Sequence, residues 1–300
     1  MDHSDIGARM KSYENCYRIY LPKRQAVIIR IDGRAFHSFT KGFNRPYDAL
    51  FAQCMRKTAK QLCENISGCV LGYTQSDEIS LVLVDYKNIN TEPWFGNNLQ
   101  KLVSISASMA TIFFHEAMAY CIHDICYSWS NLDWCNKEEM DENRNRLHKL
   151  YGTPLDHEEF DTYNHTVQTA YCNKLAVFDA RAFILPREEV ANYIYWRQLD
   201  CVRNSIQLAG QAYFSQKQLQ NKNCDQIQEM LWQEHRVNWS KYPTWFKNGV
   251  AIYKQPREIY HKNEDGTQSS VVRDKFTIDL EMPMVSQNPD FINKLVIFKE

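Results

Sequence analysis

The chain has 300 residues, of which 44% are hydrophobic and 24% are charged, and its formal net charge is −1. These values are ordinary for a globular protein and exclude a polycation. No segment looks apolar enough to span a membrane and the N-terminus has no apolar run of signal-peptide type, so we expect a cytoplasmic protein with no membrane partner.

The first predicted element is a buried strand at 26–32, because AVIIRID is apolar and rich in β-branched residues. A loop broken by glycine and proline follows at 33–48. Asp48 can cap the helix that comes next. Apolar residues repeat at helical spacing in that helix: Leu50, Phe51, Cys54, Met55 and Leu62.

Two further strands are predicted at 68–74 and 78–84, joined by a tight turn through Gln75, Ser76 and Asp77. Another helix is expected at 99–120, where apolar residues again fall on one face. The sequence up to this point therefore combines a hairpin with helices.

The second half of the chain is more polar at first. Residues 131–162 carry nine acids and four bases, which indicates a surface elaboration. Helices are predicted at 187–209, from Pro186 to about Gly210, and at 224–236. Strand candidates at 249–254 and 271–280 surround a turn-like segment, and the whole pattern predicts an α+β fold.

Ten cysteines are scattered along the chain. Because nothing suggests secretion, free thiols are expected rather than a disulfide framework. A zinc site formed by Cys121, Cys126 and Cys135 with His115 and His123 is an alternative, although its spacing fits no familiar zinc pattern.

Basic residues concentrate near the N-terminus. Residues 8–60 contain 12 Lys or Arg and only three acids. This composition suits a phosphate-rich ligand with bound metal, and a solvated basic surface would look the same. Four of these bases lie in or near the first strand and loop: Arg30, Arg34, Lys41 and Arg45.

Two carboxylates lie at the ends of predicted strands. Asp32 ends the first strand, and Asp77 lies in the hairpin turn. If those strands are neighbours, both groups reach one edge of the sheet. Nucleotidyl transfer uses two divalent cations about 3.5–4 Å apart, and magnesium is usually held by one or two carboxylates. Asp is also common at strand ends and in turns, so the spacing leaves an ordinary structural role open.

Two longer segments carry a specific resemblance. RIDGRAFHSFTKGFNRPYD (30–48) and GYTQSDEISLVL (72–83) resemble the signature segments of the tRNA-His guanylyltransferase superfamily, whose members are 3′–5′ polymerases that add nucleotides to the 5′ end of tRNA. The similarity covers most of residues 25–255. Shorter similarities follow in order: KLVSISASMATIFF (101–114), FDARAFILP (178–186), YWRQLDCVRNS (195–205) and NWSKYPTWFKNGVAIYK (238–254).

The resemblance implies a polymerase palm-like core, built on a ferredoxin-like antiparallel sheet flanked by helices. On this basis we expect a catalytic core at 1–255, a polar segment inserted at about 118–172, and a C-terminal extension at 256–300. The family also assembles as tetramers, so a homotetramer built as a dimer of dimers is expected.

The resemblance also assigns roles to residues. Asp32 and Asp77 would be the catalytic carboxylates and would hold two Mg²⁺ ions with the backbone carbonyl of Gly33, while Glu78 flanks the second ligand. His37 would face phosphate, although packing or a loop hydrogen bond is an alternative. Contacts with the nucleotide or its triphosphate are expected from Arg30, Gly33, Arg34, Ala35, Phe36, His37, Lys41, Arg45, Ser76, Lys101 and Asn204. Contacts with tRNA are expected from Arg181 and Arg203.

One departure bears on the substrate. Members that add a guanylate to tRNA-His have a His-Ile-Asn-Asn-type segment after an Asp-Cys pair, whereas here Val202 takes the histidine position. Valine has no hydrogen-bonding side chain, so that polar contact is absent. The chain thus resembles the guanylyltransferase-like branch, which repairs 5′-truncated tRNAs using the opposite strand of the acceptor stem as template.

The expected activity is therefore two-metal, templated 3′–5′ nucleotide addition to tRNA, with ATP and GTP as substrates and Mg²⁺ as cofactor. Three alternatives remain open from the sequence. They are a true tRNA-His guanylyltransferase that adds one non-templated G, a nucleotide cyclase or cyclic-dinucleotide synthase, and a non-catalytic RNA-binding palm domain.

Overall fold

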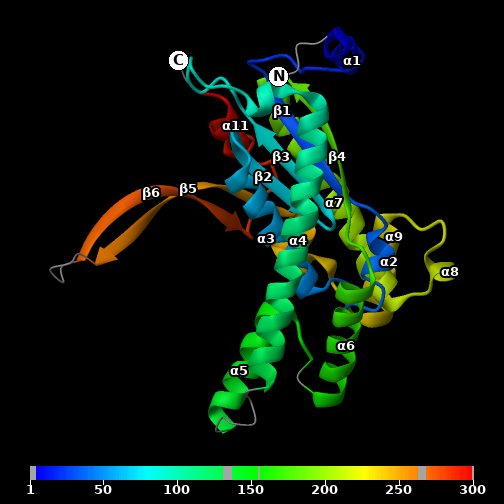
Figure 1. Cartoon of the computed structure of the whole chain (residues 1–300). Helices are drawn as coiled ribbons and strands as arrows, with labels where there is room; N and C mark the ends of the chain where they lie inside the picture. Colours follow the sequence, from blue (N-terminus) through cyan, green and yellow to red (C-terminus); the bar gives the residue numbers. More distant parts are fainter. Residues whose placement is uncertain (1–4, 131–136, 155, 263–267, 299–300) are drawn as a thin grey trace.

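The computed structural model describes residues 5–130, 137–154, 156–262 and 268–298. Its centre is a six-stranded antiparallel sheet with the strand order β4-β1-β3-β2-β5-β6 (Figure 1). This sheet with its flanking helices confirms the α+β prediction. The strands are β1 (Ala26–Gly33), β2 (Cys69–Gln75), β3 (Glu78–Leu83), β4 (Phe178–Leu185), β5 (Val250–Lys262) and β6 (Gln268–Asp279).

The predicted hairpin forms within one residue of its expected bounds. Strands β2 and β3 pair directly, and Ser76 turns the chain between them with a φ of 48°. Strand β1 pairs with β3 so that Asp32 lies opposite Glu78. The N–H of Gly33 donates to the carbonyl of Asp77 at 3.0 Å, which ties the end of β1 to the hairpin turn.

Helices α3 (Ala49–Asn65) and α4 (Leu99–Ser130) cover one face of the sheet (Figure 1). Their apolar sides pack against residues such as Ile29, Ile31 and Leu81. As predicted, Asp48 caps α3, and its side chain accepts from the N–H of Phe51 at 2.8 Å.

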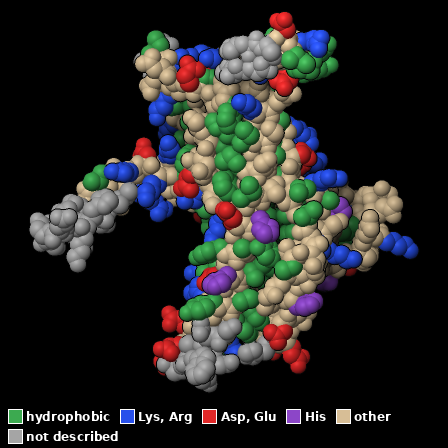
Figure 2. Space-filling view, viewed as in Figure 1, with side chains coloured by type: hydrophobic (Ala, Val, Ile, Leu, Met, Phe, Trp, Pro, Cys, Tyr) green, Lys and Arg blue, Asp and Glu red, His purple; other side chains and the backbone are tan. Residues whose placement is uncertain are grey.

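Helix α4 is longer and more apolar than expected. It continues ten residues beyond the predicted end at 120. Residues Leu99–Trp129 are long and apolar enough to cross a membrane, so the expectation that no segment qualifies is wrong. A core helix passes the same test, and Leu102, Phe114 and Met118 are buried in the core. Figure 2 shows further green side chains along this helix on the viewed surface.

The acid-rich segment continues the helical layer. Helices α5 (Lys137–Tyr151) and α6 (His157–Asn173) lie along the far half of α4, beyond the sheet (Figure 1). Their apolar residues, including Leu147 and Phe160, join the same buried cluster as α4. Some residues of the acidic segment fall outside the described residues.

The opposite face of the sheet is covered in part by α7 (Val190–Tyr213) and α11 (Asp290–Val296). Helix α7 runs past Gly210, where it was predicted to end. A Cβ on Gly210 would lie 2.8 Å from the Ile227 side chain, so this glycine permits close packing of α7 on α9 (Cys224–His235) instead of ending the helix.

The C-terminal part is continuous with the sheet. Strands β5 and β6 are longer than predicted and project as a hairpin beyond the other strands (Figure 1). β5 passes residue 255, where the core was expected to end, and Met282, Val285, Ile292 and Val296 are buried against the sheet. The remaining short elements are α1 (Asp5–Asn15), α2 (Phe36–Phe39), η1 (Trp94–Asn97), η3 (Arg187–Glu189), α8 (Gln216–Leu219), η4 (Trp239–Lys241) and α10 (Thr244–Asn248).

Candidate active site

The two predicted metal ligands come together at one edge of the sheet. Asp32 ends β1 and Asp77 precedes β3, and the Gly33–Asp77 backbone hydrogen bond joins the two segments. Burial raises the pKa of Asp77, and the negative charge of Asp32 raises it further. The two carboxylates therefore share one electrostatic environment.

Further carboxylates surround this pair. In the strand register, Asp32 lies between Glu78 on β3 and Asp179 on β4. Burial raises the pKa of Asp32, the neighbouring Asp179 raises it further, and Arg30 opposes both effects. Such accumulated negative charge is stabilised by a cation.

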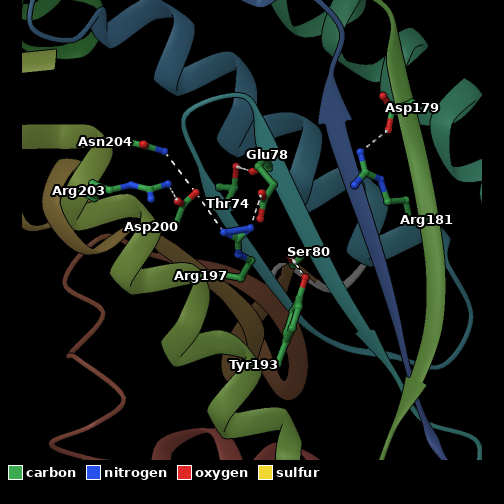
Figure 3. Close-up of polar contacts among 10 residues, drawn as sticks. All are labelled: Thr74, Glu78, Ser80, Asp179, Arg181, Tyr193, Arg197, Asp200, Arg203 and Asn204. Carbon is green, nitrogen blue, oxygen red and sulfur yellow. Dashed lines mark hydrogen bonds and ion pairs between the residues drawn. The ribbon is translucent and has the colours of Figure 1, made fainter. Parts of the chain in front are cut away.

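Glu78 is held by a buried arginine that the sequence reading did not single out. The Arg197 guanidinium on α7 contacts Oε2 of Glu78 at 3.1 Å and Oδ2 of Asp200 at 3.0 Å (Figure 3). Burial raises the pKa of Glu78 to about 7 in spite of Arg197. The WRQ segment before the Asp-Cys pair lies in one of the motifs that resemble the family, and only the tertiary structure shows what its arginine binds.

The same network extends to two predicted site residues. Asp200 also accepts from Arg203 and, at 3.3 Å, from Nδ2 of Asn204 (Figure 3). Arg203 is exposed, whereas Asn204 is partly buried. Helix α7 thus connects the buried Glu78 to polar groups at its surface.

Arg30 and Arg181 lie opposite each other on β1 and β4, on the same side of the sheet as Asp32. Arg181 is 58% exposed and lies 3.8 Å from Asp179, so its charge is available to a ligand (Figure 3). Nε of Arg30 is buried and has no hydrogen-bond partner. These bases lie beside the carboxylates, as a phosphate-bearing substrate would require.

A pocket opens to solvent beside the hairpin turn. The loop after β1, the end of β2, and helices α3, α7 and α10 form its walls. Its lining includes the predicted residues Arg45, Ser76 and Asn204, together with the aromatic side chains of Tyr47 and Trp245. Aromatic walls combined with convergent polar groups are typical of small-ligand sites.

Other predicted residues of the first loop lie close by. Arg34, His37 and Lys41 are exposed, and the positive charge of His37 acts to lower the pKa of Asp77. Ala35 has a left-handed backbone with φ 57°. Phe36 is buried in a cluster of phenylalanine rings, so its side chain serves the core.

Lys101 is not brought to the carboxylates within the chain. It lies in the first turn of α4, with its Nζ 5.5 Å from the ring centroid of Phe95, and this turn adjoins the start of β1. Thr111, almost three turns later in α4, is the residue that lies level with Gly33. Its Oγ1 accepts from the N–H of Phe178 at 3.4 Å, and Phe178 pairs with Gly33 in the sheet.

The alternative zinc site is not formed by the described part of the chain. Cys121 is buried, Cys135 lies outside the described residues, and the nine described cysteines are free. Over the same residues, no group of three or more His, Cys, Asp or Glu side chains is arranged to hold a metal. A pair of carboxylates assisted by a backbone carbonyl still suits magnesium, which keeps several waters.

Comparisons with known proteins identify the family. A family model described as tRNAHis guanylyltransferase (Thg1) matches residues 7–186. A solved bacterial Thg1-like protein in complex with ATP is 36% identical, with a TM-score of 0.72, over 98% of this chain and 100% of that chain. A related structure in complex with GTP is 34% identical, with a TM-score of 0.69 and the same coverage.

Similar curated sequences include a named guanylyltransferase and an uncharacterised viral protein. A probable tRNA(His) guanylyltransferase of Dictyostelium discoideum is 25% identical over 256 residues, which are 81% of this chain and 80% of that protein. An uncharacterised protein of Acanthamoeba polyphaga mimivirus is 29% identical over 283 residues, 91% of this chain and 83% of that protein. The chain belongs to the tRNAHis guanylyltransferase family and is a nucleotidyltransferase.

Proposed function

We propose that this protein repairs 5′-truncated tRNA by adding nucleotides in the 3′–5′ direction, with the opposite strand of the acceptor stem as template. The observation that carries the proposal is the meeting of Asp32 and Asp77 at one sheet edge, beside a pocket with aromatic walls and several exposed basic side chains. The family and the similarity to Thg1-like proteins support it.

The residues at this edge fit magnesium. All the donors are hard oxygens. Burial raises the pKa values of Asp32 and Asp77, and a neighbouring carboxylate raises each further, Asp179 for Asp32 and Asp32 for Asp77. A bound cation would reverse these shifts. Oε1 of Glu78 is buried without a hydrogen-bond partner. We assign Asp32, Asp77 and the Gly33 carbonyl as ligands, with Glu78 next to them. When bound, Mg²⁺ would acidify the attacking hydroxyl and neutralise charge on the phosphates.

The chain's own residues would orient the reactants. Arg30 and Arg181 are placed to bind phosphate oxygens, and the Ser76 side chain hydrogen-bonds Asp77. The 3′-hydroxyl oxygen of the incoming nucleotide would bond to the RNA 5′-phosphorus and lose its proton. AMP or pyrophosphate would leave, depending on whether the 5′ end was activated by ATP or already carried a triphosphate.

Val202 favours repair over addition of a single G to intact tRNA-His. Its partly buried side chain packs against the apolar cluster that includes Ile206 and Leu231. The position that is histidine in guanylate-adding members is therefore used for packing here. We also propose ATP and GTP as substrates, because the similar Thg1-like structures contain them. We also propose that the protein is located in the cytoplasm and assembles as a homotetramer.

The test is nucleotide incorporation into 5′-truncated and intact tRNA-His, with and without Mg²⁺. Wild-type protein is expected to extend the truncated RNA only when Mg²⁺ is present. Asp77→Asn should abolish extension, while Asp290→Asn, the same chemical change at an exposed position on α11, should leave it unchanged.

Two results would contradict the proposal. Near-normal turnover by Asp77→Asn would show that Asp77 is not a required magnesium ligand. Addition of one G to intact tRNA-His, without extension of the truncated RNA, would identify a guanylate-adding enzyme instead.

A further inference from the structure

Arg56 in α3 is a buried arginine in the wall of the pocket beside the hairpin turn. Only 7% of the residue is exposed. Arginine is almost never buried unless its charge is paired, so this position calls for an explanation. The sequence did not single Arg56 out, because its place on the helix predicts no particular role.

The guanidinium has few partners. Nε and Nη2 both donate to Oε1 of Gln53, at 3.3 and 2.9 Å. Its Cζ lies 5.0 Å from the ring centroid of Trp245. Nη1 has no acceptor, and within the described residues no carboxylate forms an ion pair with Arg56. Burial lowers the pKa of Arg56 to about 10, as expected for a cation held away from water and from acids.

Burying this guanidinium without a full set of acceptors costs free energy unless a ligand supplies the missing acceptor. A buried donor that lacks an acceptor retains its full desolvation penalty, and the penalty is larger when the group is charged. A ligand that brings an acceptor into the pocket would offset this penalty. Unpaired buried donors of this kind discriminate strongly, since a ligand without the matching acceptor leaves them unsatisfied.

The rest of the pocket suits a nucleobase. Tyr47, Trp245 and Phe246 provide aromatic walls, and Tyr47 lies 4.9 Å from each of the other two rings, centroid to centroid. Ser76 lines the same pocket and precedes Asp77. A nucleotide with its triphosphate at Asp77 would therefore direct its base toward these rings.

Guanine offers the better match to the free donors of an arginine. Its N7 and O6 are two acceptors on one edge, whereas adenine presents N7 next to the N6 amino donor. We propose that Arg56 reads the base edge of a purine nucleotide in this pocket and favours guanine over adenine. This inference rests on the proposed function, since it assumes that the pocket holds a nucleoside triphosphate.

Binding should also move Trp245. Nη1 is shielded from solvent and the Trp245 indole lies over the guanidinium, so we expect a base edge that reaches Nη1 to displace this indole. GTP is therefore expected to change tryptophan fluorescence, and Trp245→Phe should remove most of that change.

The test measures binding of GTP, ATP and UTP to the full chain in the absence of RNA, where no nucleotide addition can occur. Arg56→Gln is expected to weaken GTP binding roughly 10- to 100-fold, weaken ATP binding less and leave UTP unchanged. Arg56→Lys keeps the charge but loses the planar fork, so it should also lose the preference for GTP. For wild type, 7-deaza-GTP, which lacks the N7 acceptor, should bind more weakly than GTP.

Lys57→Gln is the matched control. It removes the same charge one residue along α3, where Lys57 packs 3.5 Å from the ring centroid of Tyr120 and does not line the pocket. This variant should keep the wild-type ratio of GTP to ATP affinity. If Arg56→Gln does not fold, Arg56→Lys and the comparison of GTP with 7-deaza-GTP still test whether Arg56 recognises the guanine edge.

Two outcomes overturn the inference. An equal loss of GTP, ATP and UTP affinity would mean that Arg56 acts on the triphosphate through its charge. An unchanged affinity ratio in both Arg56 variants would mean a purely structural role. These results are separate from failure of the proposed function, which would appear as absent nucleotide addition even when the Arg56-dependent preference for GTP is intact.

Discussion

Arg197 of α7 and Glu78 of β3 form an ion pair at 3.1 Å, and both side chains are almost excluded from solvent. Glu78 directly follows Asp77 and lies opposite Asp32 in the sheet. The pair therefore fixes α7 to the strand end that carries the proposed metal ligands. The ion pair links the stability of the fold to the geometry of the site.

Breaking this pair should be costly. Arg197→Ala leaves Glu78 buried without its counter-charge, so the free energy of unfolding should fall by about 3–5 kcal/mol in urea titrations. Replacing both partners, Arg197→Met with Glu78→Gln, should cost less than the sum of the single changes. Nucleotide addition by Arg197→Ala should fall roughly 10- to 100-fold, because Glu78 is no longer held. A loss of stability below about 1 kcal/mol would show that the pair is not important to the fold.

Glu78 also predicts a dependence of stability on pH. Its folded-state pKa of about 7 lies above the ordinary glutamate value of 4.5, so the folded state binds the proton more tightly than the unfolded chain. The free energy of unfolding should therefore decrease as pH rises from about 4.5 to about 7, by roughly 3 kcal/mol in total from this group, and level off above that range.

Urea unfolding of wild type and Glu78→Gln at about pH 5 and about pH 8, with EDTA present, isolates this contribution. The variant should be less sensitive to pH than wild type over this interval. Identical pH profiles would show that Glu78 titrates normally in the folded protein.

Gly249 is expected to tolerate no side chain. Its φ of 78° and ψ of −171° are nearly restricted to glycine, and a Cβ there would collide with the phenol ring of Tyr73. Gly249→Ala should lower the free energy of unfolding by about 3 kcal/mol or more. Gly96→Ala is a control, because Gly96 also has a positive φ, of 60°, but has open space around it, and should cost about 1 kcal/mol. Equal losses in the two variants would exclude the collision as a cause.

RNA binding should depend on salt through the exposed arginines. Arg181 and Arg203 are 58% and 62% exposed, and we expect each to contact a phosphate. Arg181→Gln and Arg203→Gln should each reduce the slope of log affinity against log salt by about one. Electrophoretic shift assays at several salt concentrations measure this slope. An unchanged slope for either variant would show that the substituted arginine does not contact an RNA phosphate.

The local features of the site can be predicted from the sequence. The apolar, β-branched run before Asp32 predicts a strand, and the polar turn before Glu78 predicts a hairpin, because both depend on neighbouring residues. The cap at Asp48 is local in the same sense. The resemblance to a known family then indicated that the two aspartates act together.

The tertiary structure decided the rest. Arg197 reaches Glu78 across 119 residues, and Trp245 of α10 lies over the buried guanidinium of Arg56. Gly210 lies inside a helix instead of ending it, since α9 packs closely at that point. Contacts of this kind arise when elements that are distant in the chain pack together, and neither residue propensity nor spacing encodes which side chains will then meet.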